Sequence, residues 1–193
     1  MPITRFEDLD LTRQYTYADY LTWRFQERVE LLRGWVARMS PAPNRRHQQV
    51  AGDLHLALGT YFAGHPCQLY LAPFDVRLPR TDGGESVVQP DLCVVCDEAK
   101  LTEQGCTGAP DWVLEILSPG NSRREMRDKF ALYEESGVRE YWVVDPAHDA
   151  IQTYVLDEGG RLRNGPVHYG DDEEPFAPAV FPELAVRGVQ VFG

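Results

Sequence analysis

The chain has 193 residues, a length that predicts a single domain over 1–193. Its hydrophobic fraction of 43% and aromatic fraction of 11% are typical of a globular protein, and no apolar run approaches the roughly 18 residues of a membrane span. A net charge of −11 counts against a simple nucleic-acid-binding module, but not against an enzyme with a local basic patch. The first 15 residues carry acids and lack an apolar signal core, so we expect a cytoplasmic protein.

The first half of the chain predicts two helices and a hairpin. Thr16 is typical of an N-cap and predicts a short helix over 17–25. Alternating residues over 29–40 predict a hairpin with Gly34 at its turn. Apolar residues at helical spacing then predict a long helix over 45–63.

The middle of the chain predicts strands. Alternation over 68–78 and an apolar run over 87–95 each indicate a strand, separated by a polar turn at 81–85. Because Pro90 cannot donate to a sheet ladder, the central strand proper begins near residue 91. The run 112–117 is apolar on both faces except for one acid, which is typical of an interior strand.

The second half predicts a strand–helix–strand unit and a C-terminal extension. Ser122 and Glu125 form a capping-box pattern that begins a helix over 123–136. Gly137 is expected as its C′ residue. The other predictions are a strand over 140–145, a hairpin over 151–156 and 162–164, a solvated acidic loop at 171–174, and a short final element within 182–192. The fold class is therefore mixed α/β, with a core over about 17–156 and an extension over 157–193.

Four cysteines are present, namely Cys67, Cys93, Cys96 and Cys106. The C-x-x-C spacing of Cys93 and Cys96 could indicate zinc or redox chemistry. Residues three apart on a strand point to opposite faces, however, and a structural zinc site needs two more ligands. We therefore expect buried, reduced thiols, and keep the zinc or redox interpretation as the less favoured alternative.

Two acids occupy positions where acids are costly. Asp91 opens the apolar run LCVV, and Glu115 lies inside WVLEIL. A buried carboxylate is strongly disfavoured unless it is paired or binds a metal. Two such acids on neighbouring strands could share a divalent cation such as Mg²⁺. The alternatives are a buried structural ion pair or hydrogen bond and, for Asp91 after a proline, a simple turn former.

Lys129 is also predicted at a position where a charged side chain is costly. Lys129 lies three residues after Met126 and four before Tyr133 on the predicted helix, so it shares their inward face. An inward lysine needs an anionic partner and could stabilise charge on a phosphate. The alternative is an exposed Glu125–Lys129 pair on the helix surface.

Taken together, these residues resemble the PD-(D/E)XK nuclease superfamily, which has the restriction-endonuclease-like fold with a central mixed β-sheet flanked by helices. The chain is most similar to the bacterial restriction-endonuclease family of the Uma type. The resemblance rests on Pro90-Asp91, Glu115, His47 and the segments at 30–34 (ELLRG), 39–41 (MSP), 114–119 (LEILSP) and 137–146 (GVREYWVVDP).

The resemblance implies a metal-dependent endonuclease that hydrolyses phosphodiester bonds in DNA with Mg²⁺ or Mn²⁺. Asp91 and Glu115 would hold the metal, helped by Glu30 and the backbone carbonyl of Ile116. His47 would lie beside the site as an auxiliary residue, with a packing role as its alternative. The superfamily lysine normally lies two residues after the glutamate, where this chain has Leu117. As in the family, Lys129 on the following helix is the candidate that replaces it.

Partners follow from the same interpretation. Arginines near the starts of the two long helices would contact DNA phosphates, the alternative being a solvated helix face. They are Arg45, Arg46, Arg123, Arg124 and Arg127. A homodimer or higher homo-oligomer is expected because the superfamily often cuts two strands with two subunits, and because Trp23, Trp35 and Trp142 would add apolar surface. A catalytically weak relative that binds nucleic acid or protein is the alternative function.

Overall fold

The computed structural model describes residues 3–39, 44–80 and 84–193. Its helices are α1 (Tyr17–Tyr20), α2 (Arg45–Phe62), α3 (Arg123–Ser136) and α4 (Gly188–Phe192), with short 3₁₀ turns at Phe6–Asp8 and Glu98–Lys100. None of the helices in these ranges is long and apolar enough to cross a lipid bilayer.

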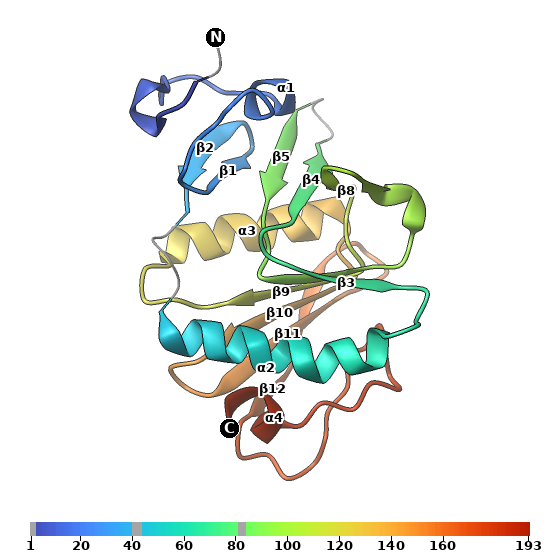
Figure 1. The fold of residues 1–193 in the computed structure, drawn as a ribbon. Coiled ribbons are helices and arrows are strands. Elements are labelled where there is room, and N and C mark those ends of the chain that lie inside the picture. Colours follow the sequence, from blue (N-terminus) through green and yellow to red (C-terminus); the bar gives the residue numbers. More distant parts are fainter. Residues whose placement is uncertain (1–2, 40–43, 81–83) are drawn as a thin grey trace.

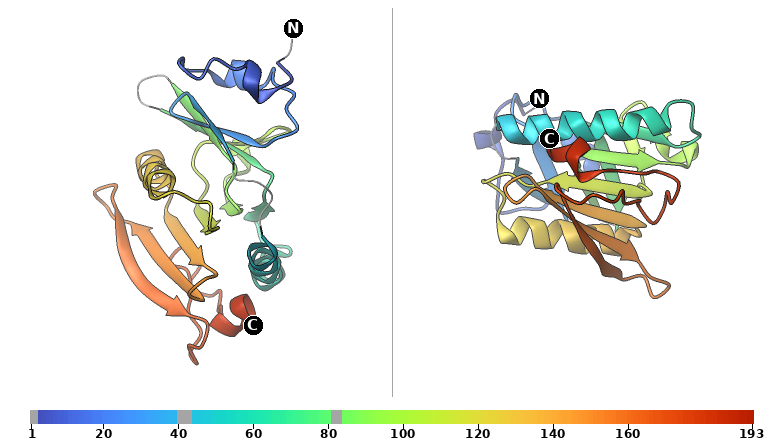
Figure 2. Two further views of the ribbon diagram at one scale, coloured as in Figure 1. Left: turned by 90° about the vertical axis from the view of Figure 1, so that its left-hand side faces the viewer. Right: turned by 90° about the horizontal axis from the view of Figure 1, so that it is seen from below.

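A mixed six-stranded sheet forms the centre of the molecule (Figure 1). Its order is β12 (Leu162–Tyr169), β11 (Ala150–Leu156), β10 (Glu140–Asp145), β9 (Trp112–Ile116), β6 (Leu92–Val95) and β3 (Gln68–Leu71). β9 and β10 run parallel, joined by α3, and the other neighbours are antiparallel. Figure 2 shows α2 and α3 on opposite faces of this sheet. The predicted central mixed sheet flanked by helices is therefore confirmed.

A second six-stranded sheet lies above the first in Figure 1. Its order is β2 (Trp35–Arg38), β1 (Val29–Leu32), β5 (Glu85–Val88), β4 (Asp75–Pro79), β8 (Gly105–Thr107) and β7 (Leu101–Thr102). The sequence does not predict it. The expected strands at 68–78 and 87–95 each divide between the two sheets. The breaks fall next to Pro73 and Pro90, which have no N–H for a ladder.

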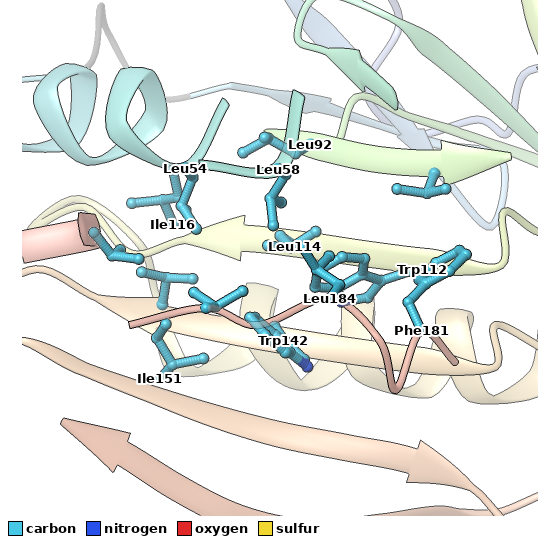
Figure 3. Packing of buried hydrophobic residues seen from close by; sticks show 14 of the residues in the cluster. Leu54, Leu58, Leu92, Trp112, Leu114, Ile116, Trp142, Ile151, Phe181 and Leu184 are labelled. Carbon is cyan, nitrogen blue, oxygen red and sulfur yellow. The ribbon is translucent and has the colours of Figure 1, made fainter. Parts of the chain in front are cut away.

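Alternation along β9 decides which side chains face each helix. Trp112, Leu114 and Ile116 pack in the cluster that contains Leu54 and Leu58 of α2 (Figure 3). The intervening residues point to the opposite face, because successive side chains of a strand alternate. Val113 accordingly packs with residues of α3. Glu115, two residues further on, faces α3 as well.

Helix boundaries follow the predictions at α2 and α3 and differ at α1. The Ser122 hydroxyl accepts the Glu125 N–H at 3.1 Å, and Gly137 ends α3 with a φ of 83°. α1 ends at Tyr20 rather than at residue 25. The physical reason is tertiary, since Trp23 leaves the helical path to pack in a separate cluster with Tyr15 and Leu31.

The segment predicted as a C-terminal extension contributes to the main core. It supplies the edge strand β12 and the helix α4, which contacts α2. Phe181, Leu184 and Phe192 are buried in the same cluster as the α2 residues. The acidic loop at 171–174 is exposed, as predicted.

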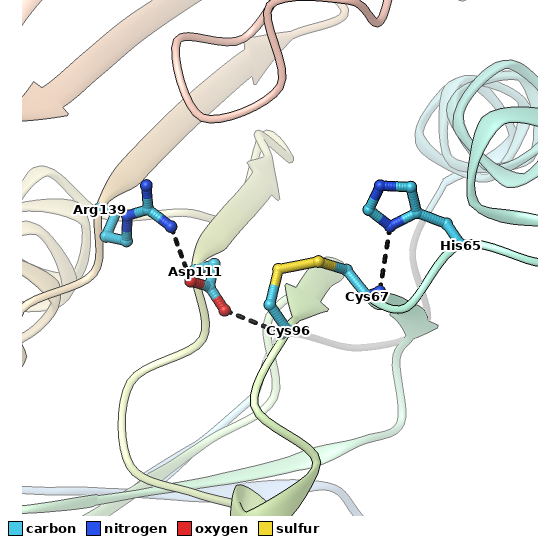
Figure 4. The surroundings of a disulfide bond; sticks show 5 residues. All are labelled: His65, Cys67, Cys96, Asp111 and Arg139. Atoms are coloured by element: carbon cyan, nitrogen blue, oxygen red, sulfur yellow. Dashed lines mark hydrogen bonds and ion pairs between the residues drawn. A yellow bond between two sulfur atoms is a disulfide. The ribbon is translucent and has the colours of Figure 1, made fainter.

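The prediction of four reduced thiols is wrong for one pair, because Cys67 and Cys96 form a disulfide (Figure 4). The antiparallel register of β3 and β6 pairs Gln68 with Val95, so the two cysteines just beyond them lie opposite each other. Their 29-residue separation hides this pairing in the sequence. Cys93 and Cys106 are buried free thiols, as expected.

A second correction concerns the tryptophans. Trp23 and Trp142 are 7% and 0% exposed and belong to the core, so they add no apolar surface. Trp35, on the edge strand β2, is 46% exposed.

Candidate active site

One cavity of about 510 Å³ brings together the acids and the lysine singled out in the sequence. Asp91, Glu115, Lys129, His47 and Ile116 all line it. The rest of its wall comes from the base of the β1–β2 hairpin, from Gln89, and from the loop and first turns that lead into α3.

Glu115 lies at the inner wall of this cavity and is 7% exposed. The Lys129 ammonium donates to its Oε1 at 2.9 Å, and the Tyr133 hydroxyl donates to the same oxygen at 2.6 Å. Burial raises the pKa of the Glu115 carboxyl to about 7, although the Lys129 ammonium opposes the rise.

Lys129 lies on the inward face of α3, where the sequence places it, and is 4% exposed. Its Nζ lies 2.9 Å from Glu115 and 3.0 Å from Oε1 of Glu30. The alternative surface pair with Glu125 does not form, because the Lys129 side chain is buried and its ammonium lies against Glu30 and Glu115. Burial alone would lower the pKa of Lys129, but the two carboxylates outweigh it and raise that pKa.

Glu30 reaches the site from β1 of the second sheet. It is 2% exposed, and its Oε1 accepts the backbone N–H of Gln89 at 2.9 Å as well as the lysine. The site therefore joins both sheets through one ammonium. The resemblance implies that Glu30 lies near the metal; in this structure its Oε1 faces Lys129.

Asp91 lies just before β6, and extending the β6–β9 register places it opposite Glu115. Its Oδ2 accepts the backbone N–H of Ile116 at 2.7 Å, and its Oδ1 lies 3.3 Å from Nε2 of His47. Burial alone would lower the pKa of His47, but the Asp91 carboxylate raises it. Asp91 thus connects α2 with β9 and is more than a turn former.

The charges and donor atoms of the cavity are compatible with a hard divalent cation. Asp91 and Glu115 line the cavity, and Glu30 lies on the other side of the Lys129 ammonium, so three carboxyl groups gather around one lysine. The buried Nδ1 of His47 has no hydrogen-bond partner among the described residues. Within the same residues, no group of three or more His, Cys, Asp or Glu is arranged to enclose a metal. Mg²⁺ suits such a site, because it keeps several waters and needs one or two carboxylates.

The arginines predicted to contact DNA lie outside the cavity wall. Arg46 binds Asp149 at 2.7 Å and the Phe192 carbonyl at 2.8 Å, which ties α2 to the C-terminus. Arg124 and Arg127 are exposed and lie 3.6 and 3.7 Å from Asp128, while Arg45 and Arg123 are exposed at the first turns of their helices.

The sequence did not assign a function to Arg28 and Arg38, which line the cavity, or to Tyr133, which contacts Glu115 at its wall. Arg28 and Arg38 line the cavity from the base of the hairpin, where the Met39 N–H donates to the Arg28 carbonyl. Tyr133 was assigned only to the inward face of its helix. Its spacing of four residues from Lys129 is the signal that places both side chains on the same carboxylate.

Comparison with known families identifies the class of protein. The model of the Uma2 family, described as "Putative restriction endonuclease", matches residues 17–189. This match covers most of the chain, and the chain belongs to the Uma2 family.

Two relatives are similar over most of their length. The uncharacterized protein slr1290 of Synechocystis sp. is 23% identical over 145 residues, which cover 74% of each chain. The crystal structure of an Anabaena variabilis protein, described as a putative nuclease belonging to DUF820, superposes with a TM-score of 0.72 at 20% identity. It covers 92% of this chain and 97% of that one. At this identity the likeness shows a shared fold.

Proposed function

We propose that this protein is a metal-dependent endonuclease of the PD-(D/E)XK type that hydrolyses phosphodiester bonds in DNA. The observation that carries the proposal is the meeting of Asp91, Glu115 and the inward Lys129 at one cavity. Membership in a family described as restriction endonucleases supports it.

In this proposal Asp91 and Glu115 hold Mg²⁺ or Mn²⁺, helped by the Ile116 carbonyl and Glu30, with His47 beside them. When bound, the metal would polarise a phosphoryl oxygen and lower the pKa of a water molecule. Lys129 is held charged by two carboxylates and would stabilise the negative charge that develops on the phosphate. His47 would hold the Asp91 carboxylate in place through its Nε2 contact.

Arginines would bind the DNA backbone. Arg28 and Arg38 line the cavity, so they are the proposed contacts nearest the cleaved phosphate. The exposed arginines Arg45, Arg123, Arg124 and Arg127 would contact phosphates further out. Arg46 remains in the proposal, although its guanidinium already has two partners.

A homodimer acting in the cytoplasm completes the proposal. Cleavage of both strands of a duplex is simplest with two copies of the site. Sedimentation velocity with and without DNA tests this, and a monomer under both conditions would contradict it.

The test of the activity uses Asp91→Asn and Glu115→Gln, assayed on plasmid DNA with Mg²⁺ and with Mn²⁺. Both changes keep the shape of the side chain and remove its charge, so cleavage should be lost while the fold remains. Asp97→Asn is the matched control, because Asp97 is an exposed acid at the opposite end of β6. Cleavage that persists in both site variants would refute the proposal.

The alternative is a catalytically weak relative that binds nucleic acid or protein. It is favoured by the net charge of −11, and by the Lys129 ammonium, which already contacts Oε1 of Glu30 and Oε1 of Glu115. Calorimetric titration with Mn²⁺ separates the two functions. A folded protein that binds no Mn²⁺ at millimolar concentration would support the alternative.

A further inference from the structure

The Tyr133 hydroxyl is placed to control the orientation of Glu115. Tyr133 is 0% exposed, and its hydroxyl lies 2.6 Å from Oε1 of Glu115. Lys129 donates to the same oxygen from one turn earlier on α3. Among the described residues, both hydrogen bonds to the Glu115 side chain therefore fall on one oxygen.

Two donors on one oxygen restrict the rotation of a carboxylate. Tyr133 and Lys129 approach from α3, so Oε1 is kept on the helix side of the site. Oε2 then accepts no hydrogen bond from a described residue. Because Glu115 lines the cavity, Oε2 is the oxygen available to a ligand there.

Lys129 alone would hold this orientation less firmly. Its ammonium has three donors, rotates freely about its stem, and is shared with Glu30 at 3.0 Å. The Tyr133 hydroxyl has one hydrogen to donate, and Oε1 of Glu115 accepts it. The rigid ring of Tyr133, packed 5.1 Å from that of Tyr141, fixes the direction of the bond.

We propose that Tyr133 is a positioning residue, which holds Oε1 of Glu115 toward α3 and so leaves Oε2 as the oxygen that would bind the divalent cation. The inference deepens the proposed function and rests on it. Residues that orient a metal ligand typically contribute about 10–100-fold to metal affinity or activity.

The chain offers a matched control. Tyr141 is buried in the same cluster as Tyr133, and its hydroxyl has no hydrogen-bond partner within the described residues. Tyr133→Phe and Tyr141→Phe therefore each remove one buried hydroxyl from the same core. Only the first removes a donor from Glu115.

The experiment compares the two variants with the wild type by calorimetric titration with Mn²⁺ and by cleavage kinetics on DNA. Tyr133→Phe should weaken Mn²⁺ binding by about 10–100-fold and lower kcat, with an unchanged KM for DNA. Tyr141→Phe should match the wild type in both measurements. Circular dichroism establishes that each variant is folded.

Glu115→Asp is the second variant, in case Tyr133→Phe does not fold. It keeps the tyrosine but withdraws the carboxylate by one methylene, so Mn²⁺ affinity should fall similarly. Wild-type affinity in a folded Tyr133→Phe, or an equal loss in Tyr133→Phe and Tyr141→Phe, would overturn the inference and leave the proposed function standing. Wild-type affinity in Glu115→Asp would overturn the inference together with the assignment of Glu115 as a metal ligand. A wild type that binds no Mn²⁺ would overturn the inference together with the metal-dependent function.

Discussion

A single ammonium at the wall of the cavity lies between two buried carboxylates from different sheets. Lys129 contacts Glu30 and Glu115, and all three side chains are less than a tenth exposed. Because these side chains have little contact with water, each charge is stable there only when it is paired with an opposite charge. An unpaired buried charge costs far more free energy than an exposed one. The same residue that we propose for catalysis therefore also stabilises the fold.

Replacing Lys129 by methionine should lower the free energy of unfolding by about 3–5 kcal/mol, the usual result of breaking a buried ion pair. Urea denaturation followed by circular dichroism measures the change. Arg124→Met is the control on the same helix, since its 84% exposed side chain should contribute less than about 0.5 kcal/mol. Equal stability of the two variants would show that the Lys129 pairings are not formed.

At the scale of elements, α3 carries both donors to Glu115 and depends on well-defined ends. Ser122 caps its first turn, and Gly137 ends it in a left-handed conformation with φ of 83°. The helix then delivers Lys129 and Tyr133 to one carboxylate because residues four apart share a face.

Substituting alanine at two helix glycines should change stability in opposite directions. Gly137→Ala should lower the free energy of unfolding by about 1 kcal/mol, because a Cβ is disfavoured at positive φ. Gly52→Ala should raise it by roughly 0.5–1 kcal/mol, since Gly52 lies inside α2 with open space around its Cα. Thermal and urea unfolding measure both, and changes of the same sign would contradict the assigned helix ends.

Across the whole molecule, an excess of acid surrounds the proposed DNA site. The net charge is −11, and the four acids that line the cavity (Glu27, Asp91, Glu115 and Glu125) outnumber its three cations (Arg28, Arg38 and Lys129). Bare DNA phosphates should therefore be repelled until a divalent cation neutralises the site.

DNA affinity should accordingly rise when a divalent cation is added at constant ionic strength. We expect a gain on the order of tenfold, equivalent to about 1.4 kcal/mol, between EDTA and Ca²⁺. Ca²⁺ shares the preference of Mg²⁺ for oxygen ligands. Fluorescence anisotropy with a labelled duplex measures the affinity. The gain should disappear in the Asp91→Asn, Glu115→Gln double variant, and its persistence there would place the cation elsewhere.

The sequence by itself determined the central sheet, the two long helices and the trio Asp91, Glu115 and Lys129. Local physics predicts where these elements and side chains lie, and the family resemblance singled out the trio among the alternatives. The spacing of apolar residues and the capping residues predict the helices. An acid inside an apolar strand stands out because burying an unpaired charge is energetically unfavourable. The helical spacing of Lys129 from Met126 and Tyr133 predicts that it faces inward.

Only the tertiary structure decided which distant residues meet. Strand register joined Cys67 to Cys96, and the second sheet brought Glu30 to Lys129 and the hairpin arginines to the cavity. It also showed that the hydroxyl of Tyr133 reaches Glu115, where the sequence indicated only a core aromatic residue. These contacts depend on how strands pair across long loops, and no local pattern of residues encodes that pairing.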